Sequence, residues 1–152
     1  MVSTKTNDCH TIGGFYGVNG EKLQRHFRDY LSDFRDWKQK PHAKQWLLYP
    51  ENIGPCLSID ETALSKGEFY TVITNEKAKG KKGALVGIFK DTKAEPIINQ
   101  LLTLSSSVRN KVQEITLDMA HSMKHLVKVC FPKATQVTDR FHVQKLAIEA
   151  LQ

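Results

Sequence analysis

Three aspartates close short apolar runs, and this pattern indicates metal-dependent chemistry. They are Asp60 after residues 57–59, Asp118 after residues 112–117, and Asp139 after residues 136–138. Because the runs are rich in β-branched residues, each Asp is expected at the C-terminal end of a strand. Two carboxylates on neighbouring strands can hold a divalent cation and support phosphoryl transfer. Asp60 and Asp118 are therefore the predicted catalytic and metal-binding pair, with Mg²⁺ or Mn²⁺ as cofactor.

A purely structural role is the alternative for each of these acids. Asp often ends a strand or caps a helix without any part in chemistry. Glu61 follows Asp60 directly and should point to the opposite side of the strand. Glu61 is therefore expected either to contact the predicted metal-binding residues without binding the metal itself or to lie on the surface.

The run 139–142, Asp-Arg-Phe-His, is the most distinctive short motif. Asp139 can cap the next helix, and His142 would lie near its first turn. Such a pair could position a phosphate or a scissile strand, whereas capping alone is the simpler interpretation. His121 and His125 lack the Glu of a zinc-protease motif and are interpreted as a helix surface.

Basic residues suggest contact with a polyanion. The candidates for DNA contact are Arg25, Arg28, Lys79, Lys81, Lys82 and Arg140. Arg25 and Arg28 are on the polar face of an amphipathic helical pattern. The three lysines belong to a turn-rich segment, which is expected beside the carboxylates. A solvated surface is the alternative for both groups. The net charge of +6 fits a nucleic-acid partner but does not require one.

The composition is that of an ordinary globular protein, with 40% apolar and 25% charged residues. No apolar run reaches the length of a membrane span, and the first residues lack the apolar core of a signal peptide. The cysteines Cys9, Cys56 and Cys130 form no Cys-x-x-Cys pair. This pattern argues against a zinc ribbon or a disulfide framework and favours reduced thiols in a cytosol.

The N-terminal part is expected to be helical. Asn19 can cap a helix, and apolar residues then recur at helical spacing: Leu23, Phe27, Tyr30, Leu31, Phe34 and Trp37. Residues 15–20 before it could serve as the turn of a helix-turn-helix whose earlier helices are missing. Residues 1–14 are polar and expected to be disordered or a cut end. Prolines and a glycine indicate a linker at residues 40–55.

From residue 57 onward, strands alternate with helices. The expected strands are residues 57–60, 69–74, 84–89, 112–118 and 136–139. A turn-rich segment, residues 75–83, should join the second and third strands as a hairpin. Helices are expected after a capping box at residues 92–95, after Asp118, and from Phe141. This order predicts an α/β fold, a ribonuclease-H-like mixed sheet with flanking helices, in which Asp60 and Asp118 lie side by side.

Three motifs carry a resemblance to a known family. They are residues 57–61 (Leu-Ser-Ile-Asp-Glu), residues 115–119 (Ile-Thr-Leu-Asp-Met) and residues 137–143 (Val-Thr-Asp-Arg-Phe-His-Val). In this order they resemble the DDE insertion-sequence transposases of the ISL-three type, closest to the short-transposase branch. The resemblance implies that Asp60 matches the first acid and Asp118 the second. It also implies that Asp139 and His142 match an auxiliary Asp-x-x-His motif.

The resemblance further implies partners and organisation. A transposase would bind transposon ends and target DNA, work in a bacterial cytoplasm, and form a homo-oligomer at full length. Residues 1–55 would be a helical segment and linker, and residues 56–152 a partial catalytic domain. The family's third acid, a Glu, lies far downstream, and Glu149 is the alternative in a compact enzyme. The chain is therefore expected to be truncated and inactive alone, and a noncatalytic DNA-binding or regulatory fragment is the alternative function.

Overall fold

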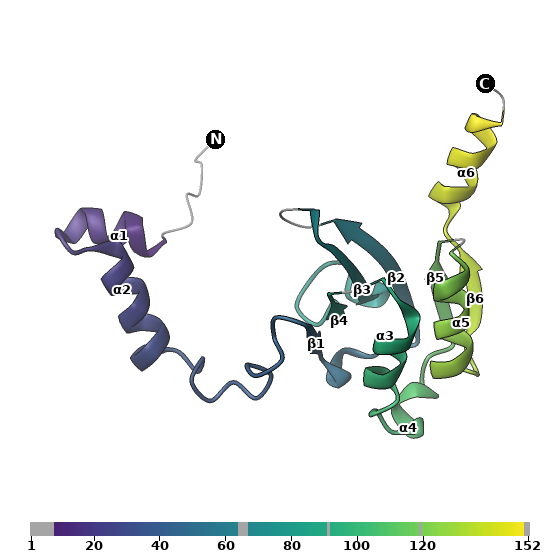
Figure 1. Ribbon diagram of the computed structural model, residues 1–152, viewed down its shortest axis with the longest axis horizontal. Coiled ribbons are helices and arrows are strands. Elements are labelled where there is room, and N and C mark those ends of the chain that lie inside the picture. Colours follow the sequence, from purple (N-terminus) through teal and green to yellow (C-terminus); the bar gives the residue numbers. More distant parts are fainter. Residues whose placement is uncertain (1–7, 64–66, 91, 119, 151–152) are drawn as a thin grey trace. The chain divides into compact units, whose positions relative to one another are not determined.

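The structure is a computed structural model that describes residues 8–63, 67–90, 92–118 and 120–150 (Figure 1). The chain divides into two compact units, Met1–Pro41 and His42–Gln152. In the described part of the first unit, residues 9–31 are mostly helical and residues 32–41 form turns. The second unit contains a mixed sheet with helices packed against it, and it carries all three aspartates of the predicted site.

The first unit contains two helices and a π-helical turn. Their bounds are α1 Cys9–Tyr16, α2 Gly20–His26 and η1 Phe27–Leu31. The predicted N-cap is confirmed, because the Asn19 side chain accepts a hydrogen bond from the Lys22 N–H at 3.0 Å. The predicted length was wrong, since the helical backbone ends before Ser32. Phe34 and Trp37 continue the apolar spacing outside the helix and contact each other, with ring centroids 6.1 Å apart.

Helix α1 lies in the segment that was expected to be disordered. Asp8 begins it by accepting a hydrogen bond from the Thr11 N–H at 2.7 Å, and Gly17 ends it with a left-handed φ of 65°. Glycines in the helix conceal it in the sequence because they lower helix propensity. Gly13 permits a close approach to the turn and to the start of α2, since a Cβ there would lie 2.5 Å from the Val18 carbonyl oxygen and 3.1 Å from the Gly20 Cα.

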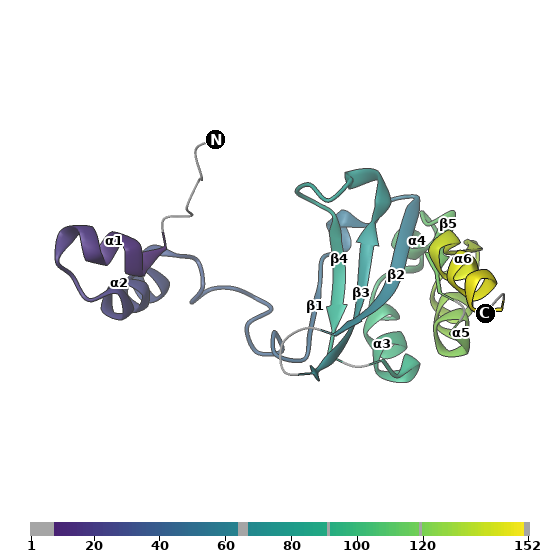
Figure 2. The same cartoon turned by 90° about the horizontal axis from the view of Figure 1, so that it is seen from above.

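The second unit is built on a six-stranded sheet with the order β1-β4-β3-β2-β5-β6 (Figures 1 and 2). The strands are β1 Trp46–Leu48, β2 Cys56–Ala63, β3 Phe69–Asn75, β4 Leu85–Phe89, β5 Glu114–Leu117 and β6 Thr135–Thr138. β2 pairs antiparallel with β3 and parallel with β5, and β5 pairs parallel with β6. The predicted pairing of the first and fourth strands, here β2 and β5, is confirmed. The fold is the predicted mixed α/β arrangement of ribonuclease-H type.

Four α-helices accompany the sheet in the described residues, together with two short 3₁₀ helices. They are α3 Ala94–Leu101, α4 Ser106–Arg109, α5 His121–Cys130 and α6 Arg140–Glu149, with η2 Pro50–Asn52 and η4 Glu76–Ala78. α3 and α5 contact each other and bury apolar side chains in one core with the sheet. Ile97 of α3 and Leu126 of α5 are fully buried, as are Leu57 of β2 and Ile115 of β5. This burial holds β2 and β5 rigidly in the centre of the fold.

Strand β1 lies within the segment predicted to be a linker. Trp46 pairs with Phe89 and Leu48 with Gly87 in an antiparallel arrangement with β4. Leu48 is the buried residue of the three in this strand. A three-residue edge strand is too short to show an alternating pattern, and the flanking prolines hid it further.

The helix between β4 and β5 was predicted, but its start was not. Lys93 occupies the N-cap position of α3 and makes no side-chain capping bond. The predicted capping box of Thr92 and Glu95 is therefore wrong by one position. Leu104 also lies beyond the helix, although it packs against the core.

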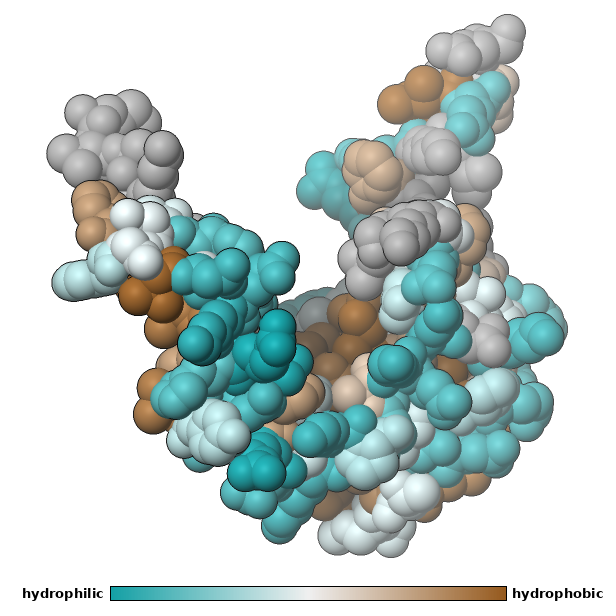
Figure 3. Space-filling view, turned by 60° about the vertical axis from the view of Figure 1, so that its left-hand side comes forward, coloured by the Kyte–Doolittle hydropathy of each residue, from teal (hydrophilic) through white to brown (hydrophobic). Residues whose placement is uncertain are grey.

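Helix α6 follows β6 as expected from the apolar pattern that begins at Phe141. Three of its hydrophobic residues are exposed, Phe141 by 68%, Val143 by 45% and Ile148 by 59%. Figure 3 shows brown and tan side chains between teal ones on this helix, toward the top right of the view. The apolar residues of α6 therefore do not belong to the core that surrounds β2 and β5.

Candidate active site

Asp60 and Asp118 lie at the same level of two adjacent parallel strands. The prediction that Asp60 ends its strand is wrong, because β2 continues to Ala63, whereas Asp118 directly follows the last residue of β5. Ile59 of β2 is paired with Leu117 of β5, and the two aspartates are the next residues along their chains. Paired residues of parallel strands share a face and a level in the sheet. The structure therefore brings the first two predicted acids together, as the order of elements predicted.

The Asp118 carboxylate, a predicted metal ligand, also accepts a hydrogen bond from the backbone. Its Oδ1 accepts a hydrogen bond from the Ala120 N–H at 2.8 Å, directly before helix α5. This bond fixes the orientation of the half-buried carboxylate. It uses one oxygen, so a cation can still be reached by the other. Asp118 thus combines a local turn at the end of its strand with a geometry suited to binding a metal, and it does not cap α5, whose N-cap residue is Ala120.

Asp60 is exposed, and Glu61 beside it is half-buried. Alternation along β2 places Glu61 on the same face as the buried Ile59, opposite to Asp60. Burial raises the pKa of the Glu61 carboxyl, and the charges of Asp118 and Asp60 raise it further. The charges of both predicted acids therefore act on the Glu61 carboxyl. The sequence predicted only that Glu61 points away from Asp60, and it did not predict this electrostatic interaction.

The third aspartate follows the next strand, β6, and directly precedes helix α6. Thr138 of β6 is paired with Leu117 of β5, and the Asp139 N–H donates to the Leu117 carbonyl oxygen at 2.9 Å. The Asp139 Oδ1 accepts a hydrogen bond from the Phe141 N–H at 2.9 Å. The capping role of Asp139 is thus present at the same edge of the sheet as Asp118. Arg140 is exposed at the start of α6, and the side chain of His142 lies outside the described part of the chain.

Comparison with known families identifies this arrangement. The model of the DDE transposase family of the ISL-three type, described as Transposase, matches residues 57–152. The chain belongs to this transposase family. The match spans β2, β5 and β6 and therefore includes all three aspartates. No curated protein matches the chain.

Membership of the family defines the class of protein. Transposases are polynucleotidyl transferases that act on DNA in transposition, and DDE members generally use divalent metal ions. Within the described residues, no helix is long and apolar enough to cross a membrane.

The donor set of the transposase fits Mg²⁺ better than a metal with many protein ligands. In the described ranges no three His, Cys, Asp or Glu residues are grouped closely enough to hold a metal ion. Mg²⁺ usually takes one or two carboxylates and completes its shell with water and substrate phosphate oxygens. Asp60 and Asp118, two acids on adjacent strands at a solvent-accessible edge, suit that requirement.

The lysine-rich turn of the transposase lies away from the aspartates. It joins β3 to β4, and the end of β3 pairs with Leu57 near the start of β2. The prediction that Lys79, Lys81 and Lys82 lie beside the carboxylates is wrong, because β3 returns antiparallel to β2. DNA contact by these exposed lysines stays a prediction.

A different lysine lies at the aspartate edge. β4 is antiparallel to β3 and hence parallel to β2, so Lys90 follows β4 at the same edge as Asp60. Its Nζ lies 2.6 Å from the Glu68 Oε1, and the Tyr70 hydroxyl donates to Glu68 at 2.8 Å. The sequence contained no local signal for this residue, because strand direction decides its position.

The remaining candidate residues divide between the two units. His121 and His125 are exposed on α5, as interpreted from the sequence. In the first unit Arg25 is exposed on α2, and Arg28 forms a two-point pair with Asp29 at 2.7 and 3.0 Å. Arg28 is thus partly neutralised, which leaves Arg25 as the stronger candidate for a phosphate contact.

We expect Mg²⁺ or Mn²⁺ to stabilise this transposase through Asp60 and Asp118. A cation offsets the repulsion between the two carboxylates, and a hundredfold excess over Kd corresponds to about 2.7 kcal/mol. The Asp60→Asn/Asp118→Asn variant should have a higher Tm than the parent in EDTA and should not respond to metal. The amide oxygen of Asn can still accept the Ala120 hydrogen bond. Thermal unfolding followed by circular dichroism measures both effects.

A matched control removes two carboxylates elsewhere. Asp33→Asn/Asp36→Asn in the first unit changes the net charge equally and should keep the metal response. An equal response to metal in the Asp60→Asn/Asp118→Asn variant and in the parent would contradict the assignment of these ligands.

Proposed function

We propose that the chain supplies the metal-binding acids of a transposase that cleaves and joins DNA strands at the ends of an insertion sequence. The parallel pairing of β2 with β5 carries this proposal, because it places Asp60 and Asp118 side by side on rigid backbone. The family match supports the same reaction class. Positioned carboxylates of this kind suit phosphoryl transfer assisted by one or two metal ions.

The two acids have different tasks in this proposal. Asp60 is exposed, and its carboxylate makes no hydrogen bond or ion pair within the described residues, so both oxygens are open to a cation. Asp118 is held in one orientation by the Ala120 N–H. A bound Mg²⁺ would activate the attacking water or 3′-hydroxyl and stabilise charge on the phosphate. Burial of the strands below limits movement of both acids.

The auxiliary residues are proposed to position DNA. Asp139 holds the first turn of α6 through the Phe141 N–H, and this bond directs the exposed Arg140 from the end of β6. Arg140 is proposed to bind a backbone phosphate near the acids. His142, one turn into the same helix, is proposed to assist at the scissile strand.

Among the described residues, no third carboxylate lies close enough to Asp60 and Asp118 to form a three-residue metal site with them. We therefore propose that these 152 residues bind metal and DNA but cleave slowly. Glu149 is exposed on the last turn of α6 rather than on a strand end. Its place in the chain does not match the context of the family's third acid.

Metal-dependent DNA affinity tests this proposal without requiring turnover. We expect Mn²⁺ to strengthen binding of a labelled DNA duplex by about tenfold relative to EDTA, equivalent to about 1.4 kcal/mol. The gain would arise because a cation held by Asp60 and Asp118 would also attract the DNA phosphates. It should vanish in Asp60→Asn/Asp118→Asn and persist in Asp33→Asn/Asp36→Asn, as measured by fluorescence anisotropy.

A nicking assay on the same samples completes the test. Rapid strand cleavage that Glu149→Gln abolishes would contradict slow cleavage and make Glu149 the third acid. A gain from Mn²⁺ that survives in the Asp60→Asn/Asp118→Asn variant would contradict the metal site itself.

A second candidate function is DNA binding by the first unit, independent of catalysis. α1 and α2 are joined by the three-residue turn Gly17-Val18-Asn19, whose first residue has the left-handed φ of 65°. Close packing at Gly13 and Gly20 leaves no room for larger side chains, because a Cβ on Gly20 would lie 2.7 Å from the His10 Cα. Two closely packed helices with a short glycine turn are typical of a helix-turn-helix.

In that arrangement α2 would be the helix placed in the major groove. Its exposed cations Lys22 and Arg25 would bind phosphates or bases. The Lys22→Ala/Arg25→Ala variant should lower the slope of log K against log salt by about 1.8, or about 0.9 for each phosphate that the protein no longer neutralises. Lys128→Ala/Lys133→Ala, which removes the same charge from the second unit, is the control. Equal slopes for the two variants would contradict DNA contact by α2.

A further inference from the structure

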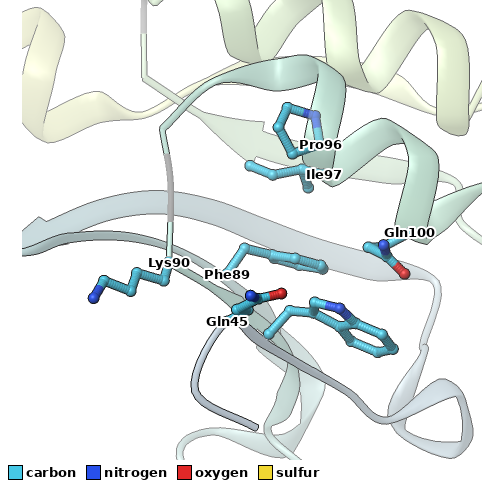
Figure 4. A pocket seen from close by; sticks show the side chains of 7 residues that line it. Gln45, Phe89, Lys90, Pro96, Ile97 and Gln100 are labelled. Carbon is cyan, nitrogen blue, oxygen red and sulfur yellow. The ribbon is translucent and has the colours of Figure 1, made fainter. Parts of the chain in front are cut away.

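A pocket lies between the β1–β4 edge of the sheet and helix α3. Its volume is about 350 Å³, within the range of small-molecule sites. Its lining is part polar and part apolar, and the apolar part consists of Trp46, Phe89, Pro96 and Ile97. Figure 4 shows Phe89 facing Ile97, with Gln45 and Gln100 beside them. All of these residues belong to the second unit.

The aromatic wall is held in a fixed orientation. The His42 ring stacks on the Trp46 indole, with centroids 3.4 Å apart and planes inclined by 8°. The His42 Nδ1 also lies 3.0 Å from the Trp46 carbonyl oxygen, which keeps the imidazole in place. One face of the indole is thus covered, and the remainder is available to the pocket. A fixed aromatic surface of this kind favours a flat ligand that can stack.

The polar groups at the pocket are amides rather than free charges. The side chains of Gln45 and Gln100 and the Trp46 indole N–H make no hydrogen bond with any described residue. The cation at the margin, Lys90, is paired with Glu68 at 2.6 Å. A pocket whose cation is already paired suits a neutral ring with hydrogen-bonding edges better than a phosphate. Gln side chains pair well with the edges of nucleobases.

The pocket and the acids share one edge of the sheet. Trp46 is paired with Phe89, Phe89 with Thr71, and Thr71 with Glu61, which follows Asp60. β1 is three strand spacings from β2, or about 14 Å at the usual spacing. At about 3.4 Å per nucleotide of a duplex strand, this distance corresponds to about four nucleotides. Trp46, Phe89 and Glu61 share the face of the sheet that α3 covers, whereas Asp60 lies on the other face. A DNA strand bound at the acids would therefore pass around this edge of the sheet to place a base in the pocket.

We propose that this pocket binds one unpaired nucleobase of the DNA strand that the enzyme processes. The base would stack on the half-buried Trp46, while the amides of Gln45 and Gln100 bind its edge. The proposal rests on DNA as the substrate of the neighbouring acids, as proposed above. Stacking on aromatic side chains is a common way for proteins to hold bases that have left a duplex.

The test uses the full chain in EDTA, so that metal binding and cleavage do not contribute. Trp37→Phe leaves Trp46 as the only tryptophan, because the chain has two, and tryptophan emission can be excited apart from that of the tyrosines. A short single-stranded oligonucleotide should quench Trp46 emission, and an abasic oligonucleotide of equal length should not. Trp46→Ala should weaken binding of the normal oligonucleotide by about tenfold, measured by anisotropy. Trp46→Phe, which retains a ring, should restore most of the affinity.

Two further variants guard against a folding defect. Gln45→Ala/Gln100→Ala leaves the apolar walls intact and should weaken binding of the normal oligonucleotide without affecting the abasic one. Phe69→Ala removes an aromatic side chain that is 60% exposed on β3 and should leave binding unchanged. Circular dichroism of each variant confirms that it is folded.

Specific results would overturn the proposal. Equal binding of normal and abasic oligonucleotides, or an equal decrease in affinity for Phe69→Ala and Trp46→Ala, would show that no base enters the pocket. Trp46 emission that responds to protein concentration and not to oligonucleotide would assign the pocket to a second copy of the chain. Asp60→Asn/Asp118→Asn should keep the base-dependent quenching, so failure of the metal site and failure of the base pocket give different results.

Discussion

The parallel pairing of β2 with β5 is the constraint on which the candidate site depends. Leu57 and Ile59 of β2 and Ile115 and Leu117 of β5 are at most 2% exposed, and their burial against α3 and α5 fixes the register. A slip of one residue would turn one strand's apolar side chains out of the core, at a cost of several buried groups. The same register brings the residues after Ile59 and Leu117 to one edge. The core therefore determines the position of the acids.

The grouping of acids that suits metal binding at that edge also destabilises the folded state, because their negative charges repel one another. The charges of Asp118 and Asp60 and partial burial raise the pKa of Glu61, so the ionised site is a cost to the folded state above the usual pKa of Glu. That cost is absent at pH values below the usual Glu pKa, grows as the pH rises from the usual pKa to the raised one, and is constant above it. The Ala120 N–H offsets part of the charge on Asp118. A divalent cation would offset more, which couples metal binding to the stability of the fold.

The sequence predicted the site more fully than its surroundings. The acids could be predicted because each follows a short alternating run of residues, and the order of elements was enough to place β2 beside β5. The end of β2 was misplaced, because the strand continues past Asp60 to Ala63. Strand β1 was missed because three residues carry no pattern, and the lysine turn was misplaced because its position depends on the direction of β3. Helix α1 was missed because Gly13 weakens its local signal while serving a tertiary contact. The pocket at Trp46 was missed because residues from β1, β4 and α3 meet only in the folded chain.

The position of a bound metal tests the central claim most directly. Crystals of the full chain grown with Mn²⁺ allow the ion to be located by its anomalous scattering. If Asp60 and Asp118 form the metal site, an anomalous peak should lie within about 2–2.5 Å of a carboxylate oxygen of each residue, with water completing the shell. A peak bound to other residues, or carboxylates directed to opposite faces of the sheet with no metal between them, would contradict the account.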